Sequence, residues 1–219
     1  MSNLNFLHSG GNKVTISAPD SNPSSDITFK LPQADGSSGQ SVVTNGSGAL
    51  SFASQGITML DQYYLASTKT GTAGQEITLD ADFNRVSGNV TAAGHIGTGM
   101  SKASGGIFTF PSTGIYLISF RTNVMLDSGT SSNRYAENKI YVTTNNSSYG
   151  YHAMGLDGIV SGSGERFGNP VCEFVFDVTN TSTHKCKFTV QSGNDAYKIY
   201  CPSSNRIDTV ATFMRIGDT

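Results

Sequence analysis

Four histidines are the first residues to consider for metal binding or proton transfer. They are His8, His95, His152 and His184, and no two of them have a metal-ligand spacing such as H-x-x-x-H. We therefore expect each histidine to be a surface or loop residue. The sequence predicts no metal site and no other cofactor site.

A second candidate for metal chemistry is the stretch "DADFN", in which Asp80, Asp82 and Asn84 copy the first ligands of a calcium loop. The sixth position of that loop should be glycine and the twelfth glutamate, but Arg85 and Thr91 stand there. We interpret the stretch as a solvated strand end.

Catalytic motifs are missing from the sequence. There is no G-x-S-x-G elbow, and the glycine pairs that begin at Gly46, Gly97 and Gly162 do not continue into G-x-G-x-x-G. No two of the 16 acidic residues can be singled out as a glycosidase pair. We expect turns at these glycines, and we assign no catalytic residue.

Aromatic residues gather in "SSYGYHAMG", where Tyr149 and Tyr151 lie beside His152. Exposed rings of this kind stack on sugars or dock on a protein receptor. The alternative is a strand whose aromatic residues simply pack. On the first interpretation, Tyr149, Tyr151 and His152 are receptor-binding candidates.

Three cysteines, Cys172, Cys186 and Cys201, cannot all pair within one chain. A hairpin that turns at residues 181–182 would place Cys172 opposite Gln191, so the thiols would not meet. We predict that Cys172 and Cys186 are small buried hydrophobic residues. The role of Cys201 is left open.

Charge is sparse and evenly scattered. The chain has 14 basic and 16 acidic residues, a formal charge of −2, and no basic stripe for a phosphate backbone, so we expect no nucleic-acid partner. No apolar run approaches the roughly 20 residues that span a bilayer, so we expect no membrane insertion. The start "MSNLNFLHSGG" lacks the features of a secretory signal.

The elements that must position these side chains are strands. Glycine (25 residues), serine, threonine and asparagine punctuate short apolar runs, and no segment keeps a helical period. Residues 1–56 contain only very short strands between turns, which cannot close a core alone and need a neighbour; a flexible tail is the alternative. From residue 57 the strands lengthen. The pattern predicts an all-β, antiparallel jelly-roll sandwich preceded by a short-stranded amino-terminal segment.

One strand is apolar on both faces. In "GIYLISF", Tyr116, Ile118 and Phe120 alternate with Ile115 and Leu117. An outer sheet normally has one polar face, so the second apolar face must be covered by a loop or by a partner subunit. The last strand, "VATFMRIG", shows the same property, and two such strands side by side would form an oligomer interface.

The stretch "FTFPSTGIYLISF" resembles the central strand of the tumour necrosis factor-like jelly roll, a family that includes the globular head of the first complement component. Its hallmark is Gly-x-Tyr followed by alternating apolar residues, here Gly114, Tyr116 and then residues 117–120. The closing "ATFMRIG" resembles the terminal strand of that family. Some of these jelly rolls bind calcium, which keeps a calcium site at Asp80 as an alternative.

Residues 27–54 carry a second resemblance. "LP-x-ADG-x-x-GQ" followed by "GSG-x-LSF" is similar to a connector ahead of tip modules in bacteriophage tail fibres, especially those of marine phages and cyanophages. The resemblance implies a homotrimer with residues 1–56 as an attachment or shaft segment and residues 57–219 as the head. It also implies that Ile115, Leu117 and Phe213 line the three-fold axis.

The sequence therefore predicts a non-enzymatic virion structural protein that is made in the host cytoplasm. Its expected partners are sister chains, other virion proteins through the amino-terminal segment, and a host surface glycan or protein. One alternative is a virion decoration or adaptor protein that touches no host. A less favoured alternative is a surface-polysaccharide hydrolase.

Overall fold

The structure is a computed structural model that describes residues 4–81, 83–86, 94–126, 134–193, 196–201 and 207–219. The chain divides into two compact units, Met1–Gly56 and Ile57–Thr219. We call the second unit the head.

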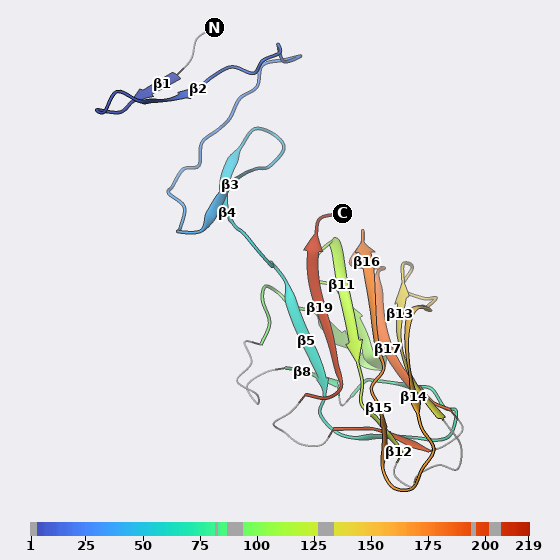
Figure 1. The fold of residues 1–219 in the computed structure, drawn as a ribbon. Helices are drawn as coiled ribbons and strands as arrows, with labels where there is room; N and C mark the ends of the chain where they lie inside the picture. The colour runs from blue at the N-terminus through green and yellow to red at the C-terminus, as the bar shows by residue number, and fades with distance from the viewer. Residues whose placement is uncertain (1–3, 82, 87–93, 127–133, 194–195, 202–206) are drawn as a thin grey trace. The chain divides into compact units, whose positions relative to one another are not determined.

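The amino-terminal unit consists of two hairpins (Figure 1). Strand β1 (Leu4–Leu7) pairs with β2 (Lys13–Ile16), and β3 (Gln40–Thr44) pairs with β4 (Leu50–Ser54). The register of the first hairpin places Leu4 opposite Ile16 and Phe6 opposite Val14, so one of its faces is wholly apolar. All four side chains are more than half exposed. No described residue of this unit is buried, so the unit has no core of its own.

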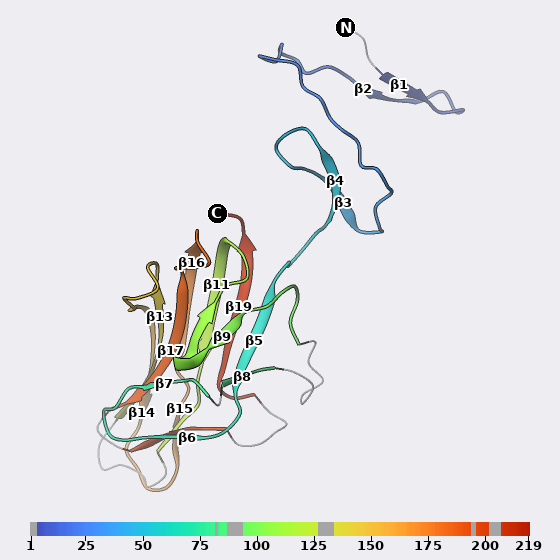
Figure 2. The same ribbon diagram turned by 180° about the vertical axis from the view of Figure 1, so that it is seen from behind.

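Antiparallel sheets build the head (Figures 1 and 2). The first sheet has the order β16 (Val171–Val178), β11 (Gly114–Arg121), β19 (Val210–Gly217), β5 (Leu60–Leu65) and β8 (Phe83–Arg85). The second has the order β14 (Gly150–Ile159), β13 (Arg134–Thr143), β17 (Lys185–Ser192), β10 (Ile107–Thr109) and β9 (Ser101–Ala103), with β7 (Ile77–Thr78) also paired to β17. A short 3-10 turn, Ser104–Gly106, joins β9 to β10.

A third, smaller sheet contains β15 (Arg166–Gly168), β12 (Val124–Leu126), β18 (Tyr197–Ile199) and β6 (Lys69–Gly71). It lies at the end of the head away from the carboxyl terminus (Figure 1). The described residues contain no helix long and apolar enough to cross a membrane. The predicted all-β antiparallel jelly-roll sandwich is confirmed.

Phenylalanine fills the space between the two large sheets. Phe108 and Phe188 of the second sheet contact Phe213 and Phe120 of the first, with ring centroids 5.1 Å apart for Phe108–Phe213 and 4.7 Å apart for Phe120–Phe188. All four side chains have no exposed surface. Tilted and edge-on pairs at such distances add to the stabilisation that burial alone gives. This cluster supplies the large aromatic volume of the core in a chain without tryptophan.

Strand β11 is central to the first sheet because branched and aromatic residues alternate along it. Tyr116, Ile118 and Phe120 are fully buried, whereas Ile115 and Leu117 are half-buried. Its neighbour β19 is the other strand predicted to be apolar on both faces, and the two pair along their length. That part of the sequence prediction is confirmed.

One buried amide ties the two sheets together. Asn138 of β13 is fully buried, and its Nδ2 donates to the carbonyl oxygens of Phe120 at 2.9 Å and Pro170 at 2.8 Å. Its Oδ1 accepts from the Gly155 amide at 3.2 Å. The side chain therefore links β13 to a backbone carbonyl of the first sheet and to the carbonyl of Pro170, just before β16.

The hairpin predicted for residues 172–190 is wrong. Strand β16 pairs with β11 in the first sheet, while β17 pairs with β13 in the second. The turn at residues 181–182 therefore crosses from one sheet to the other. Cys172 and Cys186 are nevertheless both buried, as predicted. Burial raises the pKa of the Cys172 thiol to about 12 and raises that of Cys186 as well, so neither thiol is a ready nucleophile.

Candidate functional site

The outer face of the five-stranded sheet carries a row of apolar side chains. In register across four strands lie Val175, Leu117, Met214 and Leu60. We call these four residues the apolar row. Val175 is 55% exposed and the other three are half-buried. Beside the row, Gln62 donates to Thr212 at 2.9 Å, which pairs two polar neighbours on the same face.

Phe213 does not belong to this face, which corrects the prediction that it lines a three-fold axis with Ile115 and Leu117. It lies opposite Ile118 in the register of β11 and β19 and has no exposed surface. Its ring packs on Phe108 and Phe188 in the core. Met214, the next residue, lies opposite Leu117 and takes the outer position.

A second apolar surface runs along one edge of the sandwich, where β14 and β16 come together. Val171 and Val175 of β16 are 51% and 55% exposed, and Met154 and Leu156 of β14 are 48% and 61% exposed. We call this surface the apolar edge. Val175 also belongs to the apolar row, while Met154 and Leu156 lie opposite Lys139 and Glu137 on the outer face of the second sheet, so the apolar edge joins the outer faces of the two sheets.

The outer face of the second sheet is aromatic and charged. Tyr151 lies opposite Tyr141, and Tyr141 lies opposite Lys187. The Lys187 ammonium lies 4.9 Å from the ring centroid of Tyr149 and 5.4 Å from that of Tyr141, within the range of cation–π attraction. We call Tyr141, Tyr149, Tyr151 and Lys187 the tyrosine–lysine site.

An ion-pair network borders this site. The Lys139 ammonium lies 2.6 Å from Glu137 Oε1 and 3.1 Å from Glu76 Oε2. Burial alone would lower the pKa of Lys139, but its bonds to Glu137 and Glu76 outweigh burial and raise it. For Glu76, burial acts to raise the pKa, while bonds from Thr189, Lys139 and Tyr141 prevail and lower it. The carboxylates of Glu76 and Glu137 therefore balance the charge of Lys139.

His152 points away from the two tyrosines with which it was grouped. Its ring lies 5.5 Å from that of Phe174, on the neighbouring sheet. Adjacent residues of a strand point to opposite faces, and a register shift between Ile140 and Tyr141 places Tyr151 rather than His152 opposite Tyr141. The structure thus brings Tyr149 and Tyr151 to one site and leaves His152 outside it.

Sequence reasoning missed Tyr141 and Lys187, which complete the site. Tyr141 could have been found, because Asn145 and Asn146 favour a turn, which brings "KIYVTTN" back beside Tyr151. That turn is present, with Asn146 at a positive φ of 57° and the Asn145 Oδ1 accepting the amides of Ser147 and Ser148. Lys187 comes from β17, and no local pattern places it beside β13.

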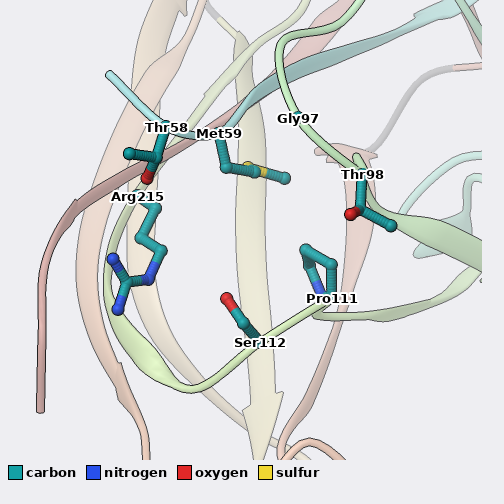
Figure 3. A pocket seen from close by; sticks show the side chains of 7 residues that line it. All are labelled: Thr58, Met59, Gly97, Thr98, Pro111, Ser112 and Arg215. Atoms are coloured by element: carbon teal, nitrogen blue, oxygen red, sulfur yellow. The ribbon is translucent and has the colours of Figure 1, made fainter. Parts of the chain in front are cut away.

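A small pocket of about 210 Å³ lies near the carboxyl end of β19 (Figure 3). Its lining residues are Thr58, Met59, Gly97, Thr98, Pro111, Ser112 and Arg215. The Arg215 guanidinium already donates through Nε to the Thr113 carbonyl at 2.9 Å and pairs with Asp218. Arg215 therefore serves the local structure, and we assign the pocket no ligand.

The predicted absence of a metal site stays a prediction. Within the described ranges, no cluster of three or more His, Cys, Asp or Glu side chains could hold an ion. Asp80 Oδ2 accepts the Gly105 amide at 2.8 Å and so supports the turn before β10. Asp82 and Thr91, two further positions of the calcium-like stretch, lie outside the described residues. His184 is a buried loop residue that stacks on Phe176.

Comparison with known proteins places the fold. No protein-family model matches the sequence, and no curated protein matches it. Among solved structures, the Eiger TNF of S. frugiperda aligns at a TM-score of 0.50 with 9% identity, over 73% of this chain and 93% of that one. The head has a TNF-like jelly-roll fold. Murine APRIL at pH 5.0 aligns at a TM-score of 0.48 with 11% identity, over 72% of this chain and 98% of its own.

Proposed function

We propose that this chain is a non-enzymatic structural protein of a bacteriophage virion, in which the TNF-like head forms a homotrimer that takes part in host-surface recognition. The resemblance of residues 27–54 to phage fibre connectors supports the viral assignment. The TNF-like fold of the head supports a self-associating module over an enzyme.

The apolar row is the observation that carries this proposal. Fully burying a leucine, methionine or valine side chain contributes roughly 1.5–3 kcal/mol, so a row of four across one sheet favours a covering surface. In the proposed homotrimer, the apolar rows of the three heads would face one another around the three-fold axis and cover each other. A three-fold ring would leave the tyrosine–lysine face of each head outside the contact.

The amino-terminal unit would provide the connection to other virion proteins. Its first hairpin presents Leu4, Phe6, Val14 and Ile16 on one face, each more than half exposed. A two-stranded ribbon is at best marginally stable alone in water. Docking of this face on a fibre, tail or capsid protein would bury those side chains and order the ribbon at the same time.

The native mass of the purified chain tests the assembly step. We expect three times the single-chain mass of 23.1 kDa by light scattering. A stable single-chain species would contradict the proposal. The same protein should then compete with virus particles for adsorption to host cells. If saturating protein does not reduce adsorption of the particles, the result would favour a virion decoration protein over a host-recognition protein.

A further inference from the structure

We propose that the tyrosine–lysine site binds an acidic sugar, a pyranose that carries a carboxylate, through Lys187 and the ring of Tyr151. This inference deepens the proposed function, since such a sugar would be the recognised part of a host surface polymer. It depends on three features of the site: a fixed ammonium, an open aromatic ring and an unsatisfied hydroxyl.

The fixed ammonium belongs to Lys187. It lies between the rings of Tyr141 and Tyr149 and makes no ion pair with any described residue. Lys139 on the adjacent strand is the useful contrast, because Glu137 and Glu76 neutralise it. Lys187 is only half-buried, so an incoming carboxylate can reach it. A charge-assisted hydrogen bond to such an anion is about twice as strong as a neutral one.

The open aromatic ring belongs to Tyr151, which is 57% exposed and has the Lys139 ammonium 5.5 Å from its centroid on one side. Its centroid lies 5.8 Å from that of Tyr141, and Tyr141 in turn lies 5.4 Å from the Lys187 ammonium. Tyr141 thus links a stacking surface to a cation over about the length of a disaccharide. A sugar ring placed on Tyr151 can direct its carboxylate, or that of the next residue, toward Lys187.

The unsatisfied hydroxyl belongs to Tyr149. Its oxygen is shielded from solvent and has no hydrogen-bond partner among the described residues. Buried polar groups of native proteins almost always have a partner. A small movement of this ring would let the hydroxyl donate to a ligand oxygen held at Lys187, which favours a ligand rich in acceptors.

The charges around the site also indicate which acidic ligands it should reject. Glu76 accepts a hydrogen bond from Tyr141 at the site itself, and Glu137 lies beyond Lys139, four residues or about 13 Å along β13 from Tyr141. They would repel a ligand with closely spaced anions. We therefore expect selectivity for one carboxylate per sugar over densely sulfated polymers.

Isothermal titration of the full chain with two acidic probes tests this inference. Trigalacturonate represents uronic acids and sialyllactose represents sialic acids, and the methyl ester of each is its neutral control. At least one acid should bind about tenfold or more tightly than its ester, a difference of about 1.4 kcal/mol. Equal binding of acid and ester, or binding of neither acid, would overturn the proposal. Triglutamate binding as tightly as the sugar acids would indicate an acidic peptide site and also overturn it.

Two variants, each with a matched control, test whether the acid binds at the tyrosine–lysine site. Lys187→Met keeps the stem between the tyrosines and should lose the preference for the acid, while Lys13→Met in the amino-terminal unit makes the same charge change and should keep it. Tyr151→Leu should weaken both acid and ester, and Tyr135→Leu on the same sheet should not. Retained acid preference in Lys187→Met would contradict the assignment even if the protein binds sugars elsewhere.

Adsorption competition separates this inference from the function on which it rests. If the unmodified chain competes with particles and Lys187→Met competes equally well, the acidic-sugar site is wrong while host recognition stands. If the unmodified chain does not compete but binds the acid through Lys187, the site stands and host recognition fails.

Discussion

The outer faces of the two large sheets of the head differ in the contacts that their side chains make. On the five-stranded sheet, Leu117 and Met214 are half-buried apolar residues. On the second sheet, Lys139 is held by Glu137 and Glu76, and the contacts described for Lys187 are with aromatic rings. Under the proposed function, the first face would gain free energy by exclusion of water and the second by directed contact with a charged group. One sandwich would then assemble with one face and recognise a ligand with the other.

The largest effect should come from a charge placed in the apolar row. Leu117→Asp would bury a carboxylate in a sister-chain contact, at a cost of several kcal/mol for each ion. We expect the native mass to fall to that of a single chain. Tyr135→Asp, a matched change on the exposed outer face of the second sheet, should leave the mass unchanged. Loss of assembly in both variants would mean that self-association does not depend specifically on the face of the five-stranded sheet.

Adjacent residues on β19 provide the next test. Phe213→Ala removes a fully buried ring and should lower the free energy of unfolding by about 3–5 kcal/mol. Met214→Ala should change it much less at low chain concentration and should instead weaken self-association. Urea unfolding at several concentrations measures both. If Phe213→Ala instead weakened self-association and Met214→Ala lowered folding stability, Phe213 and not Met214 would lie at the interface.

A slightly smaller loss is expected at the tie between the two sheets. Asn138→Leu removes the bonds that this side chain makes to the carbonyl groups of Phe120 and Pro170 and to the Gly155 amide, which should cost about 3 kcal/mol of folding stability. Asn84→Leu, an exposed change on β8, is the control and should fall within about 0.5 kcal/mol. Thermal unfolding measures the difference. A neutral Asn138→Leu would mean that the faces do not depend on a shared interior.

The smallest effect concerns the pH dependence of the second face. The pKa of Glu76 is lowered in the folded head, so its stabilising bonds are fully present above its unfolded value of about 4.3 and are lost as the pH falls through the folded value. The melting temperature should therefore decrease below pH 4.3, and Glu76→Gln should reduce that decrease. Because Glu76 is partly exposed, we expect a shift below about 4 °C. Identical acid profiles would remove Glu76 from the network.

The sequence was sufficient for the strands and for the fold class, because turn residues and two-residue alternation are local. It also identified β11 and β19 as strands apolar on both faces. It could not say which face of β19 joins Leu117, since that depends on the register between strands almost 100 residues apart. Phe213 was misplaced for this reason.

The candidate binding site was only partly predicted, again because the sequence does not show the register between strands. Tyr149 and Tyr151 were found because they stand together in the chain, and His152 was included with them on the same ground. Strand alternation separates His152 from Tyr151, and the register shift beside Tyr141 decides that Tyr151 is the one that joins the site. Lys187 enters only through the pairing of β13 with β17, and the sequence around residues 181–182 gave no sign that the chain changes sheets there.

The exposed hairpin of β1 and β2 has a consequence for how particles would mature. A ribbon with no buried residue gains almost no free energy from its own conformation, so its order must be supplied by whatever receives it. If the proposed function holds, a protease should cut the segment before that event and should not cut it afterwards. Resistance of the first 56 residues to digestion would therefore report incorporation, chain by chain, independently of anything the head does.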